Sequence, residues 1–483
     1  MKQAPPAALV VFGASGDLTA RKLIPALFEL HQSGLLPEGF ALVGTARTPL
    51  SDGDFQQRVL DSSPRRDDAW SAVVKRFRYV PGEYHEASTY RALGKVLDEL
   101  DAQHGTCGNR LFYLATLPSL FATITEQLGA AGLNVAAGDG EFARLIVEKP
   151  FGRDLASAIA LDNTVHQSFD ETSVYRIDHY LGKETVQNVL ALRFANAIFE
   201  PIWNRRYIDN VQITVAEEIG VGHRAGFYET AGALRDIVQN HVLQVLAITA
   251  MEPPAQIRPE EIRDEKVKVL KAITTMTKRD VYRHTVRGQY DGYGDEPDVA
   301  HDSATETFVA LRFMIDNWRW NGVPFYLRTG KRLRKRATEI ALEFREIPHL
   351  PFMPMNAREL GANVLVVRVQ PNEGITLRFG AKVPGPEFTV RSVNMDFTYE
   401  ETFTEESPEA YERLLFDALV GDPTLFIRSD EVHEAWRVCD PILEAWAANT
   451  QPLERYDVGS WGPAAADNLL ATDKNAWHVP TCG

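Results

Sequence analysis

The chain has 483 residues, of which 45% are hydrophobic and 24% are charged, and its formal net charge at pH 7 is −15. This length is too great for one compact core and predicts two domains, while the composition is that of an ordinary globular protein. The negative charge argues against general nucleic-acid binding, and no run approaches the roughly 20 apolar residues that cross a bilayer. The three cysteines, Cys107, Cys439 and Cys482, have no zinc or disulfide spacing, and no signal peptide is recognised, so we expect a cytoplasmic protein.

The first third of the chain alternates short apolar runs with stretches of helical periodicity. Strands are predicted at 8–15, 40–46, 110–116 and 143–149, and helices at 21–35 and 119–133. Strand, helix and strand in succession predict a parallel sheet with right-handed crossovers. We therefore expect a Rossmann-type α/β domain.

Beyond about residue 180 the pattern changes. Alternating apolar and polar residues predict strands at 210–218, 305–315 and 364–379, and helices such as 232–252 are interspersed. This predicts an α+β second domain around a large, mainly antiparallel sheet. The predicted domains are 1–178 and 179–483.

A glycine-containing turn follows the first predicted strand, in the sequence VVFGASGDLTARKL at 10–23. Gly13 and Gly16 remove the Cβ atoms between backbone and ligand, and the following helix would direct its N-terminal N–H groups at a pyrophosphate. The motif is a variant of the dinucleotide fingerprint without its third glycine, and alone it could also be an ordinary tight turn. The residues expected to hold a cofactor here are Gly13, Ala14, Ser15, Gly16, Asp17 and Leu18.

The end of the second predicted strand carries Arg47, and no carboxylate precedes Asp52. In this fold that position lies beside the adenosine ribose, where a carboxylate favours NAD and an arginine accommodates the 2′-phosphate of NADP. Arg47 could instead be a surface arginine. With the glycine turn upstream, it favours NADP.

The segment RIDHYLGKE at 176–184 concentrates ionisable groups around one glycine. His179, Tyr180 and Lys183 can converge on one phosphate, two as directional donors and one as a point charge. Asp178 would be repelled by that phosphate unless it has another task, and orienting a histidine is such a task.

His241 is a candidate for that histidine, because it lies in an otherwise apolar row with Ile237, Val245 and Ile248 on the predicted helix 232–252. A buried imidazole with a carboxylate partner is typical of a tuned general base. It is also typical of a core histidine that a backbone carbonyl satisfies, and spacing leaves both interpretations open.

Five segments in this order, GASGDLTARKL, EKPFG, RIDHYLGKE, GALRDIVQNH and RTGKRL, resemble glucose-6-phosphate dehydrogenase, and the resemblance runs from about residue 8 to past residue 400. It implies that His241 is the general base, that Asp178 orients it, and that His179, Tyr180 and Lys183 bind the sugar 6-phosphate. The implied reaction oxidises β-D-glucose 6-phosphate at C1 to 6-phosphoglucono-δ-lactone and transfers hydride to NADP, with NAD as a poorer alternative and no metal.

The resemblance also implies roles for residues that spacing alone does not single out. Glu217 and Asp236 match residues that hold sugar hydroxyls, and Lys331 and Arg336 match substrate-side cations. Lys22 and Lys149 match lysines between cofactor and sugar. Without the resemblance, the basic run 331–336 would be a solvated surface segment and Glu217 the polar end of a strand.

A sensor that binds NADP and a sugar phosphate without turnover is the alternative function. Such a protein would keep the glycine turn and Arg47 but would not need both Asp178 and His241, so these two residues favour the enzyme. Domain 1–178 is expected to bind the dinucleotide, and 179–483 to bind glucose 6-phosphate and form a homodimer or homotetramer. No nucleic-acid or membrane partner is expected.

Overall fold

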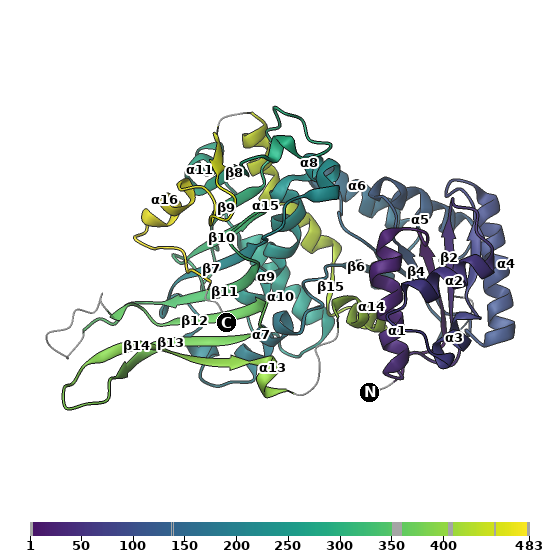
Figure 1. The fold of residues 1–483 in the computed structure, drawn as a ribbon, viewed down its shortest axis with the longest axis horizontal. Helices are drawn as coiled ribbons and strands as arrows, with labels where there is room; N and C mark the ends of the chain where they lie inside the picture. Colours follow the sequence, from purple (N-terminus) through teal and green to yellow (C-terminus); the bar gives the residue numbers. More distant parts are fainter. Residues whose placement is uncertain are drawn as a thin grey trace. The chain divides into compact units, whose positions relative to one another are not determined.

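The computed structural model describes residues 3–136, 138, 140–349, 360–403, 409–448 and 451–480 (Figure 1). The chain folds into two compact units, of which the first comprises residues 1–182, 256–263 and 408–433 and the second residues 183–255, 264–407 and 434–483. Within the described ranges, none of the helices has the length and apolar character that crossing a membrane requires.

The first unit contains a seven-stranded sheet in the order β15–β6–β5–β4–β1–β2–β3. Its strands are β1 (Ala7–Phe12), β2 (Phe40–Ala46), β3 (Arg78–Pro81), β4 (Arg110–Leu114), β5 (Ala143–Val147), β6 (Val174–Ile177) and β15 (Phe426–Ile427). All neighbours are parallel except β15, which runs antiparallel to β6. Both faces of β1, β2 and β4 are buried, which explains their continuous apolar sequences. The Rossmann-type prediction is confirmed.

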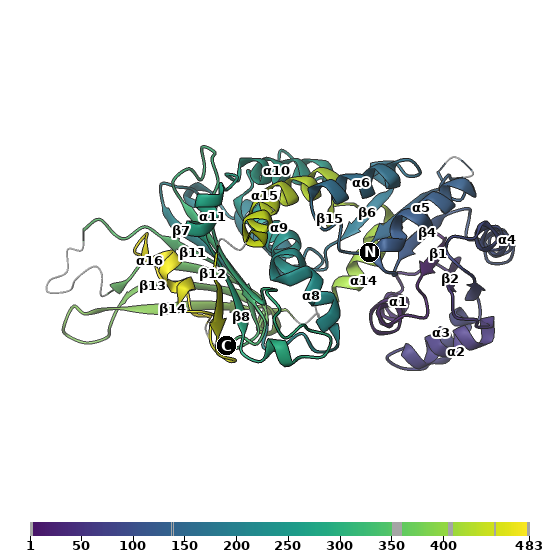
Figure 2. The same ribbon diagram turned by 90° about the horizontal axis from the view of Figure 1, so that it is seen from above.

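Helices cover both faces of this sheet, with α1 and α2 on one side and α5 and α6 on the other (Figure 2). The α- and π-helices that lie within this unit are η1 (Thr19–Leu23, a π-helix), α1 (Ile24–Gln32), α2 (Asp52–Ser62), α3 (Asp68–Val74), α4 (Ala87–His104), α5 (Phe121–Ala130), α6 (Leu155–His166) and α14 (Ala410–Val420). A reciprocal capping box between Ser51 and Asp54 starts α2, and Gly105, in the left-handed conformation at φ +65°, ends α4.

The second unit contains a nine-stranded sheet in the order β14–β13–β12–β11–β7–β10–β9–β8–β16. Its strands are β7 (Ile208–Ala216), β8 (Thr285–Tyr290), β9 (Phe308–Met314), β10 (Pro324–Gly330), β11 (Ala337–Phe344), β12 (Val364–Gln370), β13 (Gly374–Lys382), β14 (Val390–Thr398) and β16 (Leu453–Tyr456). The pairs β7–β10 and β8–β16 are parallel and the others antiparallel, which agrees with the predicted mainly antiparallel sheet.

The remaining longer helices are α7 (Glu184–Phe194), α8 (Ala225–Ala233), η6 (Leu234–Val242, a π-helix), α9 (Leu243–Ala250), α10 (Pro259–Ala272), α11 (Lys278–His284), α13 (Tyr399–Thr402), α15 (Ser429–Ala447) and α16 (Ala465–Ala471). Helices α9, α10 and α15 lie together on one side of the nine-stranded sheet (Figure 2). Strand β14 at the end of this sheet is largely exposed on both faces.

The structure differs from the predicted helix at 232–252. Gly232 has φ +68° and ψ 174°, which breaks the helical path, and the nine residues from Leu234 to Val242 form π-helix η6 before α9 begins. The predicted row of Ile237, His241 and Val245 assumed α-helical spacing. Instead, almost every side chain from 234 to 250 is buried, so no single apolar stripe exists.

One other prediction needs correction, and the predicted domain boundary can be compared with the units of the structure. The predicted strand at 364–379 is two antiparallel strands, β12 and β13, because the chain reverses at Asn372, where φ is +54°. The predicted boundary at 178/179 lies four residues before the division at 182/183. The first unit also gains 256–263 and 408–433, partly because β15 pairs with β6, a contact between segments about 250 residues apart.

Candidate active site

Gly13 shapes the turn that follows β1. Its φ is +89°, and an added Cβ would lie 2.2 Å from the carbonyl oxygen of Ala115. The N–H groups of Gly13 and Ala14 both donate to the carbonyl of Thr45, at 2.9 and 3.3 Å, which ties the turn to the end of β2. Gly13 is therefore required both for conformation and for close packing. Gly16 is less constrained, since its added Cβ would meet only the Gly13 carbonyl, at 3.1 Å.

The turn 13–16 leads directly into a helix that begins at Asp17. Gly16 and Asp17 are exposed, Ser15 and Leu18 are half-buried and Ala14 is buried, so the turn offers backbone to a ligand along 15–18. A helix N-terminus reached through a tight glycine turn is a suitable binding place for a pyrophosphate. The predicted cofactor turn thus has the local geometry that a dinucleotide needs.

Arg47 is exposed directly after β2, next to this turn. The hydroxyls of Ser15 and Thr48 lie 3.1 Å apart, so the segment with Arg47 borders the glycine turn. The parallel pairing of Phe12 with Thr45 creates this proximity, because it brings both strand ends to the same edge of the sheet.

Two predicted lysines lie elsewhere in the first unit. Lys22, on η1, donates to Glu409 at 3.1 Å, and Lys149 is half-buried after β5. Glu148, beside Lys149, is buried and accepts hydrogen bonds from the hydroxyls of Tyr113 at 2.6 Å and Tyr411 at 3.2 Å. Burial raises the pKa of Glu148 above its usual value. The sequence interpretation gave Glu148 no role, although the segment EKPFG contains it.

The segment 176–182 continues from β6 as a tight turn. Buried Arg176 forms ion pairs with Asp162 at 2.7 Å and Glu171 at 2.8 Å, which anchors the strand end. Asp178 is buried and accepts from the backbone N–H of Tyr180 at 2.9 Å, and its carbonyl accepts from Leu181. Tyr180 is buried and His179 half-buried, with their rings 5.0 Å apart.

His241 and Asp236 are buried on π-helix η6. They are five positions apart, and the i→i+5 hydrogen bonding of a π-helix brings residues at this spacing toward one face, which an α-helix would not do. Asp236 also pairs with Arg224 at 3.6 Å. The unusual helix therefore places two predicted site residues together.

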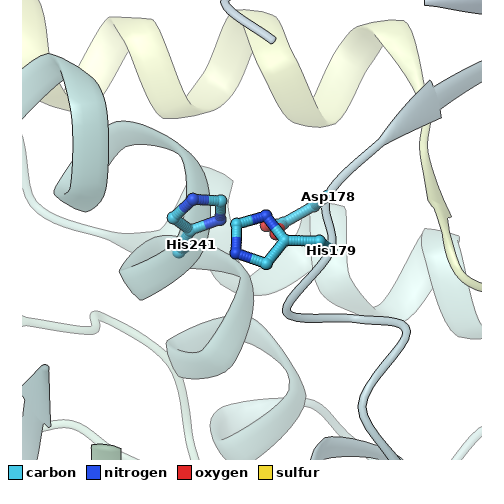
Figure 3. Close-up of side chains that lie close together, drawn as sticks. All are labelled: Asp178, His179 and His241. Carbon is cyan, nitrogen blue, oxygen red and sulfur yellow. The ribbon is translucent and has the colours of Figure 1, made fainter. Parts of the chain in front are cut away.

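Figure 3 shows Asp178, His179 and His241. Asp178 and His179 come from the turn after β6 in the first unit, and His241 comes from η6 in the second. Carboxylates and imidazoles suit proton transfer, and their donor atoms are also those of metal sites.

Long-range pairing in the second unit brings further predicted residues together. Glu217 directly follows β7 and Lys331 directly follows β10, and because these strands run parallel with Ala216 opposite Gly330, the two side chains leave the same sheet edge. Lys331 donates to Glu217, and the Glu217 N–H donates to the Gly330 carbonyl at 3.0 Å.

Lys183 and Arg336 meet at a residue that the sequence did not indicate. Both donate to the side-chain oxygen of Gln370, Arg336 at 2.9 Å. Gln370 and Arg336 line a cavity of about 360 Å³ together with Glu339, whose pKa burial raises to about 7. Gln370 is 187 residues from Lys183, so no local signal could have identified it.

Comparisons with known proteins place these residues in a family. Residues 10–188 match the model of the glucose-6-phosphate dehydrogenase NAD binding domain, and residues 190–478 match the model of the glucose-6-phosphate dehydrogenase C-terminal domain. The chain is 50% identical to glucose-6-phosphate 1-dehydrogenase 2 of Mycobacterium tuberculosis over 98% of this chain and 95% of that protein. It is 45% identical to glucose-6-phosphate 1-dehydrogenase of Bacillus subtilis, over 98% and 99%.

Solved structures agree with this assignment. A glucose-6-phosphate dehydrogenase in complex with glucose 6-phosphate has a TM-score of 0.90 and 36% identity, covering 99% of this chain and all of that one. The glucose-6-phosphate 1-dehydrogenase of Mycobacterium avium has a TM-score of 0.86 and 37% identity over the same shares. The chain therefore belongs to the glucose-6-phosphate dehydrogenase family.

Proposed function

We propose that this chain oxidises β-D-glucose 6-phosphate at C1 to 6-phosphoglucono-δ-lactone, with hydride transfer to NADP in preference to NAD. The observation that carries the proposal is that Asp178 and His241 are both buried, in a chain that is 50% identical to a protein named for this reaction. Buried ionisable groups are typical of functional sites.

In the proposed mechanism, His241 takes the proton of the C1 hydroxyl while hydride leaves C1, so that the carbon becomes the lactone carbonyl. Asp178 orients the imidazole and stabilises its protonated form. The burial of both groups supports these roles, because positioned dipoles and charges act strongly where water is excluded. The nicotinamide ring supplies the hydride acceptor.

We assign the 6-phosphate to His179, Tyr180 and Lys183. Binding the remote phosphate fixes the position of C1, which accelerates the reaction by orientation. Glu217 and Asp236 hold sugar hydroxyls, and Lys331 and Arg336 add positive charge on the substrate side. The shared contact of Lys183 and Arg336 with Gln370 supports placing these two cations together.

For the cofactor, the turn at 13–18 holds the pyrophosphate, Arg47 the 2′-phosphate of NADP, and Lys149 and Lys22 lie between cofactor and sugar. The required glycine at 13 and the exposed guanidinium beside the turn support this assignment. An arginine contributes more to the binding of a phosphate than to the binding of a bare ribose.

The test follows the absorbance of reduced cofactor after glucose 6-phosphate is mixed with NADP or with NAD. We expect turnover with both nucleotides and a higher kcat/KM with NADP. Binding of both ligands without turnover would instead establish the sensor function. Equal kcat/KM for the two nucleotides would contradict the cofactor preference alone.

The predicted assembly is a homodimer or homotetramer. The largely exposed β14, with Met395 60% and Val393 39% exposed, supports an association through this end of the sheet. The predicted cytoplasmic location remains a prediction.

A further inference from the structure

Tyr228, on α8, was given no role by the sequence, and its hydroxyl is in an unusual state. The side chain is 1% exposed. Among the residues that the structure describes, none offers a hydrogen-bond partner to the Tyr228 hydroxyl oxygen. A buried hydroxyl without a partner destabilises a fold, and replacing it by hydrogen should relieve that cost.

The surroundings of Tyr228 belong to the proposed sugar subsite of the second unit. The Nζ atom of Lys331 lies 5.5 Å from the centre of the Tyr228 ring, a cation–π geometry. Burial, followed by the negative charges of Asp236, Glu306 and Glu217, raises the pKa of Tyr228 well above its usual value. The phenol is therefore neutral and, among carboxylates, is suited to donate its proton rather than accept one.

Without substrate, Lys331 and Glu217 satisfy each other through their ion pair. We expect a sugar whose hydroxyls bind Glu217 and Asp236 to loosen this pair, and thereby to bring a sugar oxygen to the Tyr228 hydroxyl. A donor that gains its partner only when the sugar arrives discriminates against sugars that lack that oxygen.

We propose that Tyr228 is a specificity-determining residue, whose hydroxyl donates a hydrogen bond to one hydroxyl oxygen of the bound sugar. This inference rests on the proposed function and goes beyond it, because it adds a donor opposite the carboxylates of Glu217 and Asp236. The ring of Tyr228 additionally supports Lys331.

The test compares wild type with Tyr228→Phe, using glucose 6-phosphate and its 2-deoxy, 3-deoxy and 4-deoxy analogues. With glucose 6-phosphate we expect the variant to lose roughly tenfold in kcat/KM, the size of one neutral hydrogen bond. With the one analogue that lacks the partner hydroxyl, variant and wild type should agree within about twofold. The Tm of Tyr228→Phe should equal that of wild type or be up to about 2 °C higher, since an unsatisfied hydroxyl is removed.

Tyr326→Phe is the matched control, because Tyr326 is equally buried but its hydroxyl donates to Asp473 at 2.5 Å. We expect it to lower Tm and to leave discrimination among the sugars unchanged. Three results would overturn the inference: no loss with glucose 6-phosphate, the same loss with all four sugars, or a Tm decrease in Tyr228→Phe like that of the control. If wild type itself fails to oxidise glucose 6-phosphate, the proposed function fails instead.

Discussion

In the first unit, the proposed cofactor turn 13–18 is one continuous segment, whereas in the second unit Glu217 and Lys331 are 114 residues apart and meet because β7 and β10 pair in parallel. The first depends on local backbone geometry, such as the positive φ of Gly13. The second depends on sheet register, and the placement of Asp236 and His241 in the same unit depends on π-helix η6. We therefore expect a mutation in the turn to disturb only neighbouring backbone. A mutation in the second unit should disturb residues that are distant in sequence.

The largest effect is expected where the second unit supplies the proposed base. His241→Asn should lower kcat about 10³-fold and change the KM for glucose 6-phosphate little, because proton transfer is lost while the proposed contacts to the 6-phosphate remain. Steady-state kinetics measure this, with His284→Asn, on α11, as a control that should keep full activity. A near-normal kcat in His241→Asn would refute the assignment.

The local character of the cofactor turn can be tested with Gly13→Ala. Its φ of +89° and the 2.2 Å approach to Ala115 should together cost about 3 kcal/mol of unfolding free energy, measured by urea denaturation. Gly34→Ala is the matched control, because Gly34 has φ +67° but nothing within 4 Å of an added Cβ. It should cost only about 1 kcal/mol. Equal losses would show that the close approach contributes nothing.

In the second unit, burial raises the pKa of Glu339 from 4.5 to about 7. The folded state then binds more protons than the unfolded state between these pH values, so this group makes stability fall as pH rises through the window. Relative to Glu339→Gln, wild type should lose about 2 kcal/mol between pH 5 and pH 8. Burial lowers the pKa of the nearby His478 to about 4. Below pH 6.5 this second shift makes stability rise with pH, and it does so equally in wild type and in Glu339→Gln. If the stabilities of wild type and Glu339→Gln changed in parallel with pH, the raised pKa of Glu339 would be contradicted.

The smallest effect concerns exposed Arg47. Arg47→Ala should reduce kcat/KM for NADP about tenfold and for NAD less than twofold, since only NADP carries the 2′-phosphate. Added salt should shrink the difference, because exposed charges are screened. Arg91→Ala, an exposed arginine on α4, controls for the charge change. Equal reductions with both nucleotides would remove the proposed role of Arg47.

Several elements were predictable because local pattern determines them. The strand 40–46 matches β2, and the alternating run 305–315 contains β9. Others were not, such as two-residue β15, which exists only because β6 offers it an edge. In the candidate site, the glycine turn and 176–184 were visible as motifs. Gln370 and Tyr228 were not, since their significance comes from neighbours remote in sequence.

By itself, the sequence determined the fold class, the family resemblance and the residue types available for chemistry, because periodicity, glycine placement and clustered charges are local properties. Only the tertiary structure decided that Asp236 and His241 share a π-helix and that one amide receives Lys183 and Arg336. It also decided that a buried tyrosine hydroxyl lacks a partner among the described residues. The physical reason is that burial and hydrogen-bond satisfaction depend on which distant segments pack together, and a one-dimensional pattern does not contain this information.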